Sequence, residues 1–162
     1  MAKEPKQRYV LNLKLHTEFF QEDILEKRFE IGRHLYNSIL NVSLKRYNEM
    51  IKTKRWRENQ VQIANIYKLE KDEKKRKEKK IVKEYFDIRN EMLKEFRINE
   101  YSFHDDISNM QHHFKKNIDS FTAQKIASRV WKAYDKLLYG NGEQLHFKSY
   151  NKSTWKLYKN CK

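Results

Sequence analysis

Basic and aromatic side chains alternate in four short clusters of this sequence, and that combination is suited to binding nucleic acid. The clusters are Lys45–Tyr47, Lys52–Arg57, Arg129–Lys132 and His146–Tyr150. Each offers a cation for a phosphate beside a ring that can stack on an unpaired base. We expect phosphate contacts from Arg33, Arg46, Lys54, Arg55, Arg57, Arg129, Lys132 and Lys148. We expect stacking from the rings that fall off the apolar stripes, which are Trp56, Trp131 and Tyr150.

Acidic residues show no arrangement typical of a metal-dependent nuclease, which needs converging carboxylates to hold Mg²⁺. Asp105 and Asp106 form an acidic pair without an adjacent base. A helix that starts after Ser102, with acids near its amide end, explains this pair better than a metal site. The sequence also lacks a glycine-rich phosphate loop and a local triad signature. We therefore expect neither catalysis nor a cofactor.

Histidine and cysteine are also poorly placed for metal binding. His112 and His113 are neighbours, so on a helix their side chains point in different directions. Cys161 is the single cysteine, which excludes a Cys-x-x-Cys zinc site and an internal disulfide. We expect no bound metal.

Charge and length limit the class of partner. The chain has 162 residues with 36 Lys and Arg against 22 Asp and Glu, a formal net charge of +14. This excess favours a polyanionic partner, and the length fits one domain. No window reaches the roughly 20 apolar residues of a membrane span, and the start lacks a secretory signal, so we expect a cytoplasmic protein without membrane contact.

Apolar spacing predicts mostly helices. Alternating apolar residues from Tyr9 to Leu15 predict one strand, and Thr17 is a candidate N-cap for a long helix through Ile51. The stripe breaks near residues 53–57, and two further apolar stretches around a lysine-rich run at 68–80 predict an antiparallel helical hairpin with a charged tip.

The last third predicts two more elements and a return to extended chain. Apolar residues from Tyr101 to Phe114 indicate a short helix, and Thr122–Leu138 is amphipathic with Tyr134 on its inner face. Gly140 and Gly142 favour a helix stop, and the alternation beyond them suggests extended backbone.

Two blocks of the sequence resemble a known family. The first is YVLNLKLHT followed by ILEKRFEIGRHLYNSILNVSLKRYN, with an Arg-x-x-Tyr-Asn pattern at Arg33, Tyr36 and Asn37. The second is SFTAQKIASRVWKAYDKLLYGNGEQLHFKSYNKS, with Phe-Lys-Ser at 147–149. Together they resemble the N-terminal part of the transposon-encoded TnpB (OrfB) proteins, RNA-guided nucleases related to the type V CRISPR effectors.

The resemblance implies a fold of mainly α class with a small β component. A β-barrel would begin with a strand at 1–16, be interrupted by a helical recognition insertion at 17–139, and resume at 140–162 with a tail, all within a single nucleic-acid-binding lobe. In the family this lobe holds the guide RNA scaffold and reads a short duplex DNA motif. Ser120 and Gln124 match the family's duplex-facing helix, while Phe121 replaces its first glutamine.

The family continues into a nuclease domain that this sequence does not contain. We therefore expect a chain truncated before that domain, which binds structured guide-type RNA and duplex DNA without nuclease activity. Two alternatives remain: a helical interaction protein that binds an acidic partner protein, and a regulator that competes with a full-length relative for its nucleic acid. Residue patterns leave the oligomeric state undetermined.

Overall fold

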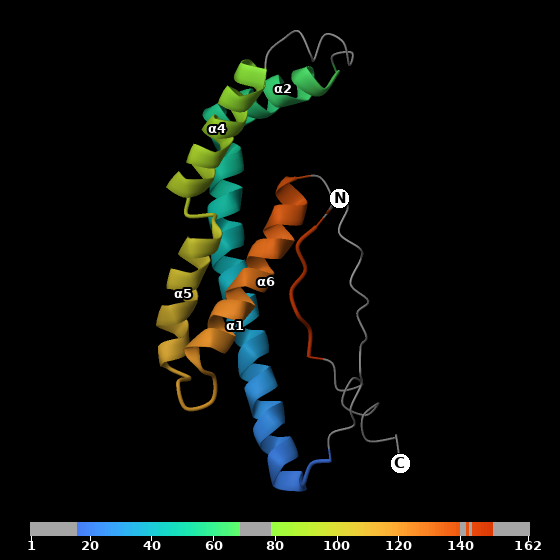
Figure 1. Ribbon diagram of the computed structural model, residues 1–162, viewed down its shortest axis with the longest axis vertical. Coiled ribbons are helices and arrows are strands. Elements are labelled where there is room, and N and C mark those ends of the chain that lie inside the picture. The colour runs from blue at the N-terminus through green and yellow to red at the C-terminus, as the bar shows by residue number, and fades with distance from the viewer. Residues whose placement is uncertain (1–15, 69–78, 140–141, 143, 151–162) are drawn as a thin grey trace, which may run out of the picture.

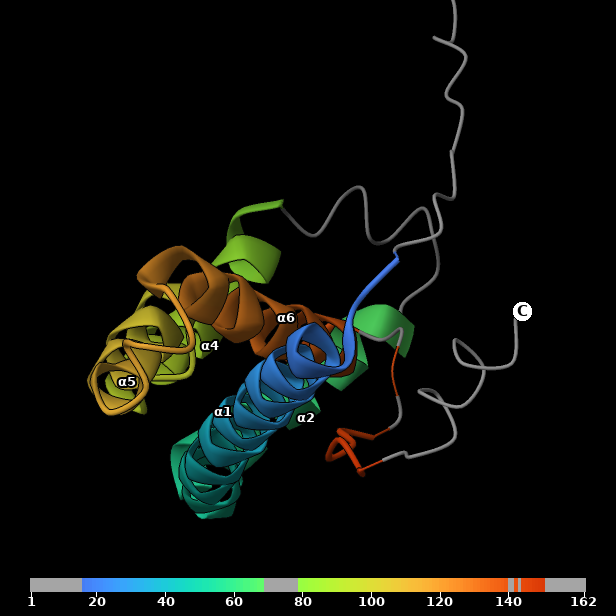
Figure 2. The same ribbon diagram turned by 90° about the horizontal axis from the view of Figure 1, so that it is seen from below.

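The computed structural model describes residues 16–68, 79–139, 142 and 144–150, and these residues form five helices (Figure 1). The helices are α1 (Phe19–Lys52), α2 (Lys54–Lys68), α4 (Lys79–Glu95), α5 (Glu100–His112) and α6 (Ser120–Leu138). α1 runs the length of this assembly. α5 and α6 lie along one flank of α1, whereas α2 and α4 pair near its C-terminal end (Figures 1 and 2).

α1 confirms the long helix predicted from the first apolar stripe. Its 34 residues extend over about 51 Å at 1.5 Å per residue. The helix begins after Glu18, whose backbone N–H donates to Gln21 Oε1 at 3.1 Å, so the cap lies one residue after the predicted Thr17. Ile31 and Leu35 begin its buried stripe, and the preceding turns expose their apolar side chains.

A single residue separates α1 from α2. Thr53 has extended backbone, and its hydroxyl donates to Met50 O at 2.7 Å and accepts from the Trp56 N–H at 3.2 Å. The hydroxyl therefore serves both the end of α1 and the start of α2, because each helix end leaves backbone groups without intrahelical partners. The predicted break in the apolar stripe is confirmed at this position.

α2 and α4 form the predicted helical hairpin. Arg55 on α2 donates to Glu91 at 3.0 Å and to Glu95 at 3.5 Å, both on α4. Asn59, which is 5% exposed, donates to the Tyr85 carbonyl oxygen at 3.2 Å. The predicted charged tip at residues 69–78 lies outside the described residues.

α4 ends in a left-handed turn made without glycine. Arg97 has φ of 54°, and the Ile98 N–H donates to Leu93 O at 2.7 Å while the Arg97 N–H donates to Lys94 O at 2.9 Å. This pair of hydrogen bonds is the Schellman motif, which normally places glycine at the left-handed position. The turn redirects the chain into α5.

α5 and α6 pack as an antiparallel pair. The side chain of Asn99 accepts from the Ser102 N–H at 2.9 Å and caps α5, so the helix starts before Ser102, earlier than predicted. Gln111 Nε2, buried in the last turn of α5, donates at 2.6 Å to the carbonyl oxygen of Ile118 in the connection between the two helices. Asp119 caps α6 by accepting from the Thr122 N–H at 2.9 Å.

The core is built around aromatic rings from three helices. Tyr134 on α6 lies edge-on to Phe103 on α5, with ring centroids 5.6 Å apart, and to Tyr47 on α1 at 6.0 Å. Tyr134 Oη makes no well-formed hydrogen bond among the described residues, and the neighbouring Ser43 hydroxyl donates to Leu40 O. Burial raises the pKa of the Tyr134 phenol. The predicted inward position of Tyr134 is confirmed.

The predicted β component is wrong for the part of the chain that is described. Residues 144–150 carry no strand, and no sheet or barrel forms among the described ranges. The Asn37 side chain provides the physical reason, because it satisfies the backbone of Lys148 as a neighbouring strand would. Asn37 Nδ2 donates to Lys148 O at 2.9 Å, and the Lys148 N–H donates to Asn37 Oδ1 at 2.8 Å. The strand predicted at Tyr9–Leu15 lies outside the described residues.

No helix among the described residues is both long enough and apolar enough to cross a bilayer.

Candidate nucleic-acid interface

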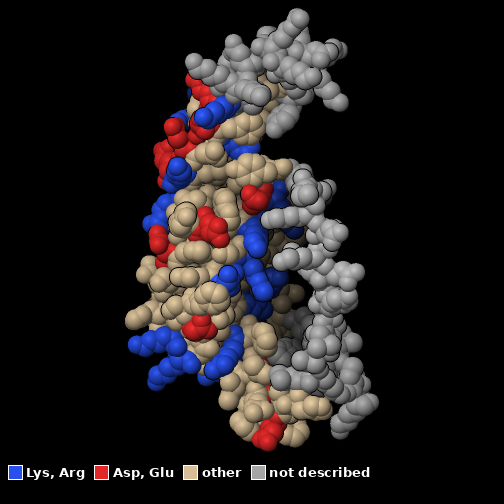
Figure 3. Space-filling model, viewed as in Figure 1, with Lys and Arg blue, Asp and Glu red and all other residues tan. Residues whose placement is uncertain are grey.

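Four cations line the outer side of α6. Lys125, Arg129, Lys132 and Lys136 recur every three or four residues, so they occupy one face of the helix, which we call the α6 basic face. All four are exposed, and none joins an ion pair with another described residue. Figure 3 shows Lys and Arg atoms gathered over α6.

The α6 basic face is held outward by the packing of the opposite side. Ala123, Ala127, Val130 and Tyr134 are each no more than 1% exposed and fill the interface with α5 and α1. Small alanine side chains permit close helix packing there. The cations consequently lie on a helix whose rotation about its own axis is fixed by the core.

Both ends of α6 are anchored. At the N-terminus, Asp119 accepts from the Thr122 hydroxyl at 2.6 Å, and this hydrogen bond is the main reason that the pKa of Asp119 is lowered. At the C-terminus, Arg89 from α4 donates to Leu138 O at 2.5 Å and lies 4.5 Å from the centre of the Tyr139 ring. The first contact is local to the start of α6, whereas the second joins the end of α6 to α4.

The geometry of the face suits a phosphate backbone. Lys125 and Lys136 are separated by eleven residues, or about 16 Å along the helix axis. Asp135 is the single acid within α6 and makes no ion pair with a described residue. Lys115 and Lys116 add exposed positive charge in the α5–α6 connection. The cations can therefore meet several phosphates together.

Four predicted contact residues come together on α6. Arg129 and Lys132 belong to the basic face, while Ser120 and Gln124 are exposed in the first two turns of the helix. Lys125 and Lys136 were not predicted. Their spacing relative to Arg129 and Lys132 is visible in the sequence, and projecting all α6 cations onto one helix would have found them.

Two predicted stacking rings do not present free faces. Trp56 is 7% exposed and belongs to the core, so the stacking prediction does not hold for it. α2 begins two residues before Trp56, which places this ring on the same buried side as Ile63, seven residues later. Trp131 is half-buried and packs edge-on to Phe103 at 6.1 Å.

The predicted phosphate ligand Arg46 has a structural partner instead. Its guanidinium donates to both carboxylate oxygens of Asp106 at 2.5 and 3.2 Å, and Arg97 donates to the same carboxylate at 3.3 Å. The Asp106 side chain is 13% exposed. This network joins α1 to α5, so Asp106 is neither a helix start residue nor a free metal ligand.

Predicted cations near α2 fall into two groups. Arg55 is engaged by acids of α4, as described above, and Lys54 lies 3.6 Å from Glu58. Lys54 remains 84% exposed, so this contact restrains it weakly. Arg57 is exposed without an ion pair to a described residue. These residues belong to a different part of the structure from the α6 basic face.

Arg33, Lys148 and Tyr150 meet where residues 144–150 lie against α1. Arg33 donates to Lys148 O at 3.1 Å and to Glu30, and its guanidinium lowers the pKa of Glu30 chiefly through the hydrogen bond. Tyr150 Oη donates to Glu26 at 2.5 Å, and this bond is the leading cause of the raised pKa of Tyr150. Because Glu26 and Glu30 lie beside these residues, this group is a weaker phosphate site than the α6 basic face.

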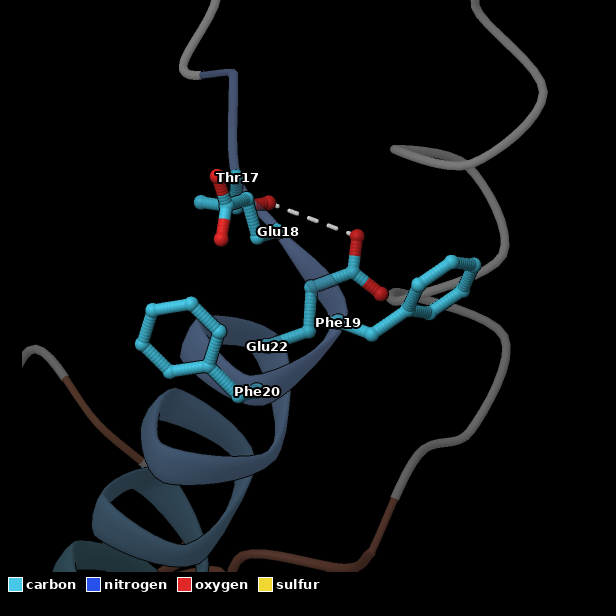
Figure 4. A pocket seen from close by; sticks show the side chains of 5 residues that line it. All are labelled: Thr17, Glu18, Phe19, Phe20 and Glu22. Carbon is cyan, nitrogen blue, oxygen red and sulfur yellow. Dashed lines mark hydrogen bonds between the residues drawn. The ribbon is translucent and has the colours of Figure 1, made fainter.

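A hollow at the start of α1 has a different character. Thr17, Glu18, Phe19, Phe20 and Glu22 line it, and the Thr17 hydroxyl donates to Glu22 Oε1 at 3.3 Å (Figure 4). Phe19 is 84% exposed and Phe20 is 58% exposed. The carboxylates of Glu18 and Glu22 in this hollow would repel phosphate.

The described part of the chain contains no group of three or more His, Cys, Asp and Glu side chains arranged to hold a metal ion. No family model, curated protein or solved structure matches this chain.

Proposed function

We propose that this chain is a cytoplasmic nucleic-acid-binding protein that grips the phosphate backbone of structured RNA or duplex DNA with the α6 basic face. One observation carries the proposal: four exposed cations without ion-pair partners among the described residues lie along one fixed helix face. Most other candidate cations either have acidic neighbours or lie away from this face. The resemblance to TnpB proteins supports the same partner class, with a helical rather than barrel-containing scaffold.

The mechanism is charge neutralisation with release of counterions. Each side chain of the α6 basic face replaces condensed cations at a phosphate, so the logarithm of affinity falls linearly with the logarithm of salt concentration. Four duplex phosphates give a slope of about −3.6. Affinity should then fall about 150-fold between roughly 50 and 200 mM salt because of this face alone. Chemistry on the bound strand forms no part of the proposal.

The test compares two variants of equal charge. The first replaces the α6 basic face with glutamine at Lys125, Arg129, Lys132 and Lys136. The control replaces four exposed α1 cations, which likewise form no ion pair with a described residue, with glutamine: Lys27, Arg28, Lys45 and Lys52. Binding to duplex DNA and to a hairpin RNA is measured by fluorescence anisotropy across the salt range, and circular dichroism checks the fold.

The α6 variant should lose most of the salt dependence, whereas the α1 control should retain a steep slope. Equal losses from the two variants would contradict the assignment to α6. Undetectable binding by the folded wild-type protein at low salt would contradict nucleic-acid binding and would favour an acidic partner protein instead. A second experiment compares binding to RNA transcribed from the protein's own locus with binding to a scrambled RNA of the same length. A preference for the locus RNA that persists at higher salt would support guide-type RNA as the ligand.

A further inference from the structure

One aromatic ring on the outer side of α6 has no role in the core. Phe121 is 66% exposed and lies four residues before Lys125, so it continues the α6 basic face by one turn toward the helix N-terminus. Its neighbour Ala123 faces the buried side at 1% exposure. Rotating α6 to bury Phe121 would withdraw Ala127 and Val130 from the core, so the ring is held outward.

We propose that Phe121 is a stacking site for an unpaired nucleobase, placed at the end of the phosphate-binding α6 basic face. This inference rests on the proposed function and specifies its ligand: a nucleic acid with at least one unstacked base next to a backbone that follows α6. Proteins that bind such ligands combine a cationic track with exposed aromatic rings. Phe121 and the α6 basic face supply both on a single helix.

The position of Lys125 supports this role. Its ammonium lies 4.9 Å from the centre of the Phe121 ring, a cation–π distance. The contact places positive charge beside the ring, so that a phosphate bound by Lys125 would bring its own or the adjacent base to Phe121. The exposed amide of Gln124, three residues after Phe121, offers a donor and an acceptor on the same part of the helix.

Single exposed apolar residues are common on protein surfaces and need no function. Phe121 differs in its setting, because its ring lies on the same helix face as four cations that have no acidic partner among the described residues. The other candidate rings are less available. Trp56 is buried, Trp131 packs on Phe103, and the Tyr150 hydroxyl is bonded to Glu26.

The first experiment locates the contact directly. A hairpin RNA with 5-iodouridine in its loop is bound to the full chain and irradiated, and the crosslinked residue is identified by mass spectrometry. Iodouracil crosslinks efficiently to rings on which it stacks, so the adduct should map to Phe121. A crosslink that maps to Trp131, Tyr150 or another aromatic residue, with none at Phe121, would overturn the inference.

The second experiment measures what the ring contributes. Affinity is compared for a hairpin with intact loop bases and for the same hairpin with abasic loop positions, using wild type, Phe121→Leu and a control, Tyr101→Leu. Tyr101 is an 82% exposed ring on α5, outside the α6 basic face. Stacking on one base corresponds to about 5-fold to 160-fold in affinity.

Wild type and Tyr101→Leu should prefer the intact loop by that factor, and Phe121→Leu should lose the preference while still binding the abasic hairpin like wild type. A preference retained by Phe121→Leu would overturn the stacking site. That result would leave the proposed function intact. The proposed function fails by a different result, namely that neutralising the α6 basic face leaves binding of the abasic hairpin and its salt dependence unchanged.

Discussion

The amide of Asn37 is expected to hold residues 144–150 against α1, and removing it should expose Lys148 to trypsin. The side chain donates to Lys148 O at 2.9 Å and accepts from the Lys148 N–H at 2.8 Å, so it restrains both backbone groups of one residue. Trypsin cleaves after lysine and requires the peptide to leave its bound conformation. Asn37→Ala removes both hydrogen bonds and leaves the helix intact, because alanine favours helix.

The size of the effect follows from the two bonds. Each contributes about 0.5–1.5 kcal/mol net, and their exposed setting favours the lower half of that range. A loss of about 1–2 kcal/mol corresponds to a roughly 5-fold to 30-fold rise in the population of the open segment. When reclosing is faster than cleavage, the cleavage rate rises by the same factor.

The assay follows cleavage after Lys148 by mass spectrometry under native conditions, with Asn41→Ala as the control. Asn41 lies one turn further along α1, is exposed, and makes no hydrogen bond to residues 144–150. Cleavage should accelerate in Asn37→Ala and stay at the wild-type rate in Asn41→Ala. An unchanged rate in Asn37→Ala, or an equal increase in both variants, would refute the reasoning.

Three further predictions concern stability. Arg46→Ala should destabilise the fold by about 1–3 kcal/mol in chemical denaturation, because it removes the main partner of the largely buried Asp106 carboxylate. Arg97→Gly should raise stability by up to about 1 kcal/mol in the same assay, since glycine adopts a φ of 54° without steric cost. The pKa of Asp119 lies below its ordinary value of 3.8, owing first to the hydrogen bond from the Thr122 hydroxyl. The ionised carboxylate therefore stabilises the fold fully above pH 3.8, and this contribution disappears as the pH falls through the lowered pKa. Asp119→Asn should consequently lose less thermal stability than wild type on acidification below about pH 4.

Each of these predictions has an outcome that would count against it. An Arg46→Ala protein as stable as wild type would show that the ion pair with Asp106 contributes little. A destabilised Arg97→Gly would mean that the exposed contact with Asp106 outweighs the relief of backbone strain. Parallel acid profiles for wild type and Asp119→Asn would contradict the lowered carboxyl pKa.

Helices were predictable where a periodic apolar stripe is long. α1 and α6 start and end within about two residues of the prediction, because Leu40, Leu44 and Tyr47 or Val130 and Tyr134 repeat at helical spacing. The α2–α4 hairpin was likewise predictable from the apolar stretches on either side of the lysine-rich run. Local hydrogen bonds such as the Asn99 cap decided boundaries that the stripes left open.

The remaining features depended on contacts between distant parts of the chain. Arg46 and Asp106 are 60 residues apart, and neither position signals the other in the sequence. Trp56 is predicted to bind because it falls where the apolar stripe breaks, whereas α2 begins at Lys54 and turns the ring inward. Alternation in the sequence after α6 predicts extended chain within a sheet, whereas the amide of Asn37 provides the hydrogen-bond partner for Lys148.

The short connection between α5 and α6 has a consequence for the order of folding. The two helices pack closely and are neighbours in the sequence, so their pairing closes a small loop and costs little chain entropy. α1 is synthesised before both of them. As α6 emerges during translation, its packing surfaces on α5 and α1 already exist, and the helix that bears the cations can dock without waiting for later residues.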